Sequence, residues 1–196
     1  MKKLLVIIVL SLLLSVASKA DDISNFEIEG ISIGDSALDH FNINQIKNNS
    51  WDYYKKKKFT PVQIENFSVD GKNFFDNYDA VDFDFKTDDK EFIISSINGI
   101  ITKYDNYNEC LRIKEKITND LKKIFKNTKM GNGEGKHRAD PTGKSIYNVS
   151  YFDFENGDSA DVTCYNFSPE SGHQDNLAVR LNTKEFIKFM RSNPYE

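Results

Sequence analysis

The sequence predicts an α+β fold in which helices cover an antiparallel sheet, and three observations support this. Several short runs alternate apolar with polar residues between turns, which is typical of half-buried strands. Residues 106–126 repeat apolar side chains at spacings of three and four, which indicates one face of an amphipathic helix. Asn156 and Gly157 lie between two alternating runs, and this pair is typical of the turn in an antiparallel hairpin.

The N-terminus has the pattern of a secretory signal peptide. Residues 1–3 include two lysines, Leu4–Val16 is apolar apart from two serines, and Ser18 and Ala20 are the small residues of a cleavage site. We therefore expect residues 1–20 to be removed. An uncleaved membrane anchor is the alternative, but a spanning helix needs about 20 apolar residues and this run is shorter.

The rest of the chain, residues 21–196, suits a single domain with a sizeable core. Loss of the signal peptide removes three lysines and no acid, so the formal net charge changes from −4 to −7. An acidic chain gives no support for a nucleic-acid partner, and a single apolar run excludes a multi-pass membrane protein. We expect a periplasmic or secreted protein with no stable membrane anchor.

The first half of the domain is predicted to contain an extended lead-in, a helix and three strands. Ser36 supplies a helix N-cap, and Asp39 three residues later favours the first helical turn. The third strand is apolar on both faces, so we expect it to be central, with Gly99 marking a bulge or bend. In chain order these elements are the lead-in 25–33, the helix 36–47, and the strands 61–67, 78–85 and 91–102.

The second half is predicted to begin with the long helix and to continue through a Gly-rich segment at 128–145, which we interpret as a flexible connector. The Asn-Gly turn then joins strands at 145–154 and 158–167. Alternating apolar residues predict a last strand over 177–181, and Thr183 is placed to cap a terminal helix.

Both cysteines lie on predicted inward faces. Cys110 belongs to the apolar stripe of the long helix, and Cys164 shares a strand face with Ala160 and Val162. An exported chain enters an oxidising compartment, where two cysteines with none left over favour one disulfide. We therefore predict a Cys110–Cys164 bridge that pins the helix to the sheet; a buried pair of free thiols is the alternative.

The chain also contains an internal echo, since Tyr78 precedes a Phe-Asp-Phe triplet by five residues and Tyr147 does the same. The element order favours a duplicated α-β-β-β unit, whereas chance similarity between two strands rich in Asp and Phe explains the residues without duplication. In outline this order is similar to small exported α+β folds of the β-lactamase-inhibitor and outer-membrane-assembly-lipoprotein families. No motif of either family is present, so the resemblance implies no residue role and no activity.

Two segments are candidate binding sites. Trp51 and Tyr54 precede four adjacent lysines, a composition that suits an anionic surface, although a solvated turn with the aromatic rings folded beneath it is the simpler explanation. Lys136, His137 and Arg138 lie in the Gly-rich segment, and loops of this length often carry binding residues.

Other chemistries have weaker support in the sequence. Residues 138–145 end like a phosphate-binding loop, but Arg138 replaces the first glycine and the order of helix and strand is reversed. Neither His137 nor His173 has a zinc spacing, and no nucleophile motif is present. The acidic strand face of Asp82 and Asp84 suits a solvated surface, with a loose divalent-cation site as the alternative. The sequence points to no catalytic residue, no metal ligand and no cofactor.

These observations predict a non-catalytic binding or accessory protein of the bacterial cell envelope, which acts by contact with an envelope protein through the sheet or the 128–145 segment. Two alternatives remain. One is an exported hydrolase that uses His137 or His173 beside a carboxylate. The other is a protein that binds a small ligand or a divalent cation.

Overall fold

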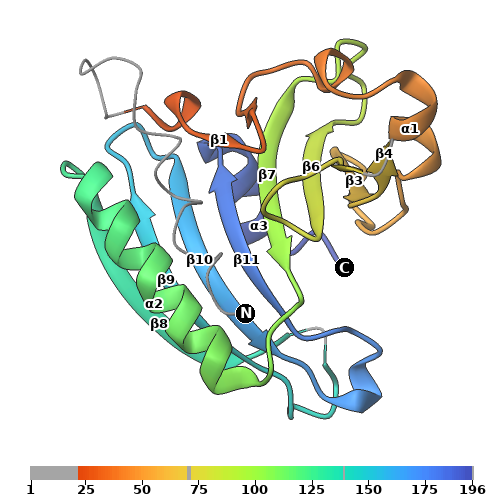
Figure 1. The fold of residues 1–196 in the computed structure, drawn as a ribbon. Coiled ribbons are helices and arrows are strands. Elements are labelled where there is room, and N and C mark those ends of the chain that lie inside the picture. Colours follow the sequence, from red (N-terminus) through yellow and green to blue (C-terminus); the bar gives the residue numbers. More distant parts are fainter. Residues whose placement is uncertain (1–21, 70–71, 139, 196) are drawn as a thin grey trace.

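The computed structural model describes residues 22–69, 72–138 and 140–195, so the predicted signal peptide lies outside the described residues. Its main feature is a seven-stranded, wholly antiparallel sheet in the order β3-β6-β7-β11-β10-β9-β8 (Figure 1). The α+β prediction is therefore confirmed. The strands are β3 (Phe59–Glu65), β6 (Ala80–Lys86), β7 (Ile94–Ile101), β8 (Lys129–Lys136), β9 (Ile146–Asp153), β10 (Ser159–Asn166) and β11 (Asn176–Asn182). Two small hairpins add β1 (Glu27–Ile28), β2 (Ile31–Ser32), β4 (Ser68–Val69) and β5 (Lys72–Asn73).

The long helix and the terminal helix begin where the sequence predicts. Asn106 accepts a hydrogen bond from the Glu109 amide at the start of one, and Thr183 accepts from the Phe186 amide at the start of the other. The α-helices are α1 (Ile43–Asn48), α2 (Tyr107–Ile124) and α3 (Lys184–Arg191); the short 3₁₀ turns are Ile23–Asn25, Ala37–Asp39 and Pro169–Ser171. None of the helices within the described residues is both long and apolar enough to cross a membrane.

The single helix predicted over 36–47 is wrong. Ser36 does cap a turn, but that turn ends after Asp39, and a second helix begins after Asn42. Asn42 and Gln45 form a reciprocal capping box, in which each side chain bonds to the other residue's backbone amide. This second start signal overrides continuation of the first turn.

One face of the sheet carries the main core. Inward side chains such as Phe83, Ile97 and Phe152 pack against Ile28 and Phe41 from the N-terminal segment. Further along the sheet, α2 packs against β10 and β11 on the same side (Figure 1). The predicted Cys110–Cys164 disulfide is present there, so the helix is covalently joined to the sheet.

The Gly-rich segment is not a flexible connector, because residues 129–136 form β8 at one edge of the sheet. This strand pairs with β9 along its whole length without a bulge. Its glycines accept side chains from β9: a Cβ atom at Gly131 would lie 2.2 Å from the Tyr151 hydroxyl, and one at Gly135 would lie 3.1 Å from the Tyr147 hydroxyl. Aromatic cover of this kind compensates for the low strand propensity of glycine.

Gly99 also differs from expectation, because the irregularity in this part of the sheet falls between Asp84 and Phe85 instead. Gly99 makes room for the Tyr78 ring, whose Cε1 would lie 2.4 Å from a Cβ atom at this position. Since β8 is a strand, the second half of the chain contributes four strands where three were expected. This order departs from a second α-β-β-β unit, and the duplication stays a prediction.

Candidate binding face

The face of the sheet opposite α2 carries a row of polar side chains, and we call it the polar face. The strand registers place its members opposite one another from one edge of the sheet to the other. In order they are Gln63, Asp82, Asn98, Arg180, Asp161 and Tyr151, with Gly131 at the end of the row. Only part of this face is covered. Helix α3 lies against the sheet on this side (Figure 1), and Tyr54 and α3 pack over Phe59 of β3.

Arg180 is the centre of this row. Its guanidinium donates to Asp161 at 3.0 Å and to the Thr163 hydroxyl at 2.9 Å, and it lies 5.5 Å from the centre of the Tyr165 ring. Burial opposes its charge, but the Asp161 carboxylate more than compensates and holds the pKa of Arg180 above its ordinary value. The cation is therefore permanent and fixed in direction, as recognition of a polar or anionic group requires.

Two further carboxyl groups, Asp82 and Asp84, lie on the side of Arg180 away from Asp161, and burial raises the pKa of both. Burial raises the pKa of Asp82 to about 7, with Glu65 adding to the effect and Arg180 opposing it. Burial likewise raises the pKa of Asp84 to about 8, although a 3.0 Å hydrogen bond from the Tyr54 hydroxyl opposes the shift. Asp82 and Asn98 face each other across the strands, and each has a buried side-chain oxygen without a hydrogen-bond partner among the described residues.

The hydroxyl of Tyr54 is expected to stabilise the fold through Asp84. Tyr54→Phe removes the donor while keeping the ring, so we expect a loss of about 1–2 kcal/mol in the free energy of unfolding at pH 9, where Asp84 is charged. At pH 5, where Asp84 is protonated, the loss is expected to be smaller. Urea unfolding at the two pH values measures both, and an equal loss at both would contradict the role of the charged acceptor.

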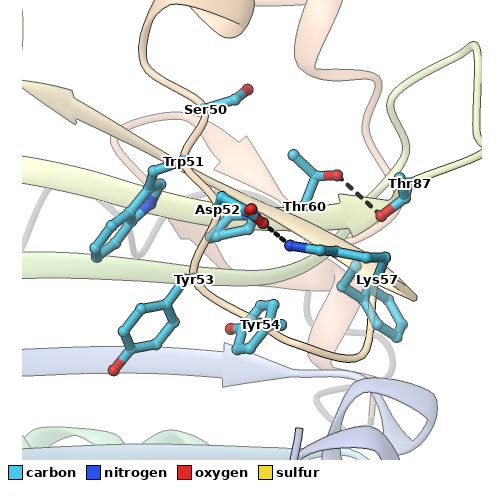
Figure 2. Close-up of a pocket in the computed structure, with 10 residues that line it drawn as sticks. Ser50, Trp51, Asp52, Tyr53, Tyr54, Lys57, Thr60 and Thr87 are labelled. Atoms are coloured by element: carbon cyan, nitrogen blue, oxygen red, sulfur yellow. Dashed lines mark hydrogen bonds and ion pairs between the residues drawn. The ribbon is translucent and has the colours of Figure 1, made fainter. Parts of the chain in front are cut away.

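Trp51 and Tyr54 line the same shallow pocket, of about 230 Å³, between the 50–57 segment and β3 (Figure 2). Trp51 is 46% exposed and stacks on Tyr53, whereas Tyr54 is only 6% exposed and points into the protein. Lys57 is tied to Asp52 across the pocket mouth. Of the two predicted binding residues, Trp51 is therefore available to a partner, whereas Tyr54 is a buried part of the pocket lining.

The other predicted group lies at the end of β8, of which Lys136 is the last residue. Lys136 and Arg138 are exposed. The centre of the His137 ring lies 5.0 Å from that of Phe167, 5.5 Å from that of Tyr165 and 6.4 Å from that of His173. Burial lowers the pKa of His137, and His173 and Arg180 lower it further against the opposing effect of Asp140. His137 is thus a neutral member of an aromatic cluster at neutral pH.

The alternative of a histidine–carboxylate pair finds a specific obstacle here. Asp140 is the carboxylate next to His137 in the chain, but it accepts hydrogen bonds from the backbone amides and hydroxyls of Ser145 and Thr142 and from the Ser168 hydroxyl. These bonds hold the pKa of Asp140 well below its usual range. The Nδ1 atom of His137 has no partner among the described residues, so no acid orients this ring. Within the same residues, no three His, Cys, Asp or Glu side chains gather in a way that could hold a metal ion.

Both predicted segments border the polar face, and tyrosines lie between them. The ring centres of Tyr53 and Tyr195 lie 5.2 Å apart near Trp51. Those of Tyr165 and Phe167 lie 5.4 Å apart near His137. Burial raises the pKa of Tyr165 against the opposing effect of Arg180, and Asp161 and, to a smaller extent, Tyr53 add to the rise. We call these rings, with Trp51 and His137 at the two ends, the aromatic band.

Comparison with protein-family models, with curated proteins and with solved structures finds no match for this chain. Its function must therefore be argued from the polar face itself. Sequence reasoning did not single out Arg180 and Asp161, the ion pair at the centre of that face. The available signal was Arg180 itself, a charged residue within the apolar run of β11.

Proposed function

We propose that this chain is an exported, non-catalytic binding or accessory protein that contacts an envelope protein through its polar face and aromatic band. The observation that carries the proposal is the composition of this face. Tyrosine, tryptophan and arginine side chains border or line a partly uncovered sheet, and these residue types dominate the energetics of protein–protein interfaces. The central arginine is already held by Asp161, so little ordering entropy is lost when a partner binds.

A periplasmic or secreted location fits this function. The Cys110–Cys164 disulfide is compatible with an oxidising compartment, and the N-terminal pattern predicts export. A face of aromatic rings and one fixed cation also suits contact with protein better than catalysis at His137, because Asp140 is occupied by hydroxyl and amide donors and does not orient this ring.

The test is capture of partners from envelope extracts with matched variants. Trp51→Ala removes an exposed ring at one end of the aromatic band, and Arg138→Ala removes the exposed side chain that follows His137 at the other end. We expect each to reduce the captured protein by about tenfold, which corresponds to loss of one interface residue of moderate weight.

Two control variants remove similar side chains from other surfaces. Leu38→Ala shortens an exposed apolar residue of the N-terminal segment, and Lys122→Ala removes an exposed cation of α2. Both are expected to leave capture unchanged. Equal losses with the controls and with the band variants, or no loss with Trp51→Ala and Arg138→Ala, would disprove a partner site on this face.

A further inference from the structure

The two edges of the seven-stranded sheet are treated differently. At the β3 edge, the Trp51 amide donates to the Pro61 carbonyl and the Gln63 amide donates to the Asn49 carbonyl, so neighbouring chain covers the strand. At the other edge, no described residue pairs with the outer side of β8. This strand has eight residues, no proline and no bulge, and native proteins usually protect such an edge.

The register identifies which backbone groups face outward. The His137 amide donates to the Ser145 carbonyl, so β8 residues with odd numbers bond to β9. A second bond supports this assignment. The Phe154 amide donates to the Asp158 carbonyl, so the even-numbered residues of β9 bond to β10 and its odd-numbered residues are left to bond to β8. The amides and carbonyls of Met130, Asn132, Glu134 and Lys136 therefore point away from the sheet.

This outer edge is symmetric about Gly133. On the polar face, the side chain of Val149 lies over Gly133, and the hydroxyls of Tyr151 and Tyr147 lie over Gly131 and Gly135 on either side of it. The outward backbone groups are arranged with the same symmetry. A strand that matches such an edge is the same strand turned about a two-fold axis through Gly133.

We propose that β8 pairs antiparallel with β8 of a second copy of this chain, with Gly133 opposite Gly133, so that the two sheets become continuous. Gly131 of one copy then faces Gly135 of the other as a pair without hydrogen bonds to each other, and their Cα atoms lie about 4.5 Å apart. The Tyr151 hydroxyl of one copy therefore meets the Tyr147 hydroxyl of the other above the glycines. Because Gly131, Gly133 and Gly135 have no side chains, β8 places no side chain between the two tyrosines.

The side chains on the opposite side of β8 also complement one another in this register, which places Asn132 opposite Glu134 twice. Ser150 donates to the Asn132 oxygen at 2.7 Å and itself accepts from the buried Lys114 at 2.7 Å, so the Asn132 amide group is oriented and its N–H atoms are directed elsewhere. An exposed carboxylate directly opposite is a suitable acceptor. No two like charges face each other in this register.

The pairing is tested by the oligomeric state of the purified protein, measured by sedimentation at several concentrations. Glu134→Pro removes an outward amide and the carboxylate opposite Asn132 but no hydrogen bond to β9, and Pro61 shows that this sheet accepts proline in an edge strand. We expect the wild type to form dimers and Glu134→Pro to be monomeric with a near-normal melting temperature.

Two further variants test whether Asn132 of one copy lies opposite Glu134 of the other. Asn132→Asp keeps the acceptor for Ser150 but places a carboxylate opposite Glu134, so we expect dimer dissociation to become about tenfold easier or more. Asn132→Asp combined with Glu134→Gln restores a donor opposite an acceptor, and we expect dimer affinity to return.

A wild type that stays monomeric at every concentration would overturn the proposal, as would a dimer that survives Glu134→Pro. Failure of the double variant to recover would exclude this register. The inference extends the proposed function, but its failure is distinguishable: partner capture through Trp51 and Arg138 is measured separately from self-association.

Discussion

Reduction of the Cys110–Cys164 disulfide is expected to lower the free energy of unfolding by about 4 kcal/mol, because the bridge closes a loop between residues 54 positions apart. Both sulfurs are buried between α2 and β10, where the bridge joins a helix to a central part of the sheet. Urea unfolding with and without reductant measures the loss. With a typical m value of about 2 kcal/mol per molar, the midpoint should fall by roughly 2 M.

The control is the double variant Cys110→Ala/Cys164→Ala, whose unfolding should not respond to reductant. Identical midpoints for the oxidised and reduced wild type would contradict the prediction, and so would ready alkylation of both thiols in the unreduced protein. Because the bridge acts largely on the unfolded chain, the folded structure of the reduced protein should keep its secondary structure.

The stability of this protein is expected to fall steeply as the pH rises from about 4 to 8. Burial raises the pKa of Asp82 to about 7 and that of Asp84 to about 8, whereas an unfolded aspartate has a pKa near 3.9. Between these values the folded state holds protons that the unfolded chain has released. The stabilisation from these two protonated groups is therefore complete below about pH 4. As the pH rises above this value, the free energy of unfolding falls by about 1.4 kcal/mol per pH unit for each proton that only the folded state holds.

The variant Asp82→Asn/Asp84→Asn replaces both acids by neutral groups of the same shape and is expected to flatten this part of the stability profile. Above pH 8 it should be more stable than the wild type. Asp79→Asn is the matched control, since hydrogen bonds from Lys103 and Thr102 outweigh burial and lower the pKa of Asp79. The control should lose stability at neutral pH and keep the wild-type slope between pH 5 and 7. Parallel profiles for the wild type and the double variant would refute the prediction.

Local signals were sufficient for most of the fold. The 3.6-residue period of the long helix, the caps at Asn106 and Thr183, and the Asn-Gly turn each act over a few residues, so they can be recognised without tertiary contacts. The disulfide followed from two such local patterns combined. The predicted binding residues Trp51 and His137 were likewise visible in the sequence, but their positions at the two ends of one aromatic band were not.

The sequence alone determined the α+β class, the positions of the long and terminal helices and the pairing of the two cysteines, because periodicity and caps depend on near neighbours. Only the tertiary structure decided that 129–136 is a strand, that Arg180 and Asp161 form the centre of the polar face, and that two buried aspartates have raised pKa values. The physical reason is the same in each case. A glycine strand needs tyrosines from its neighbour, and a charge is perturbed by what surrounds it, and these contacts join residues far apart along the chain.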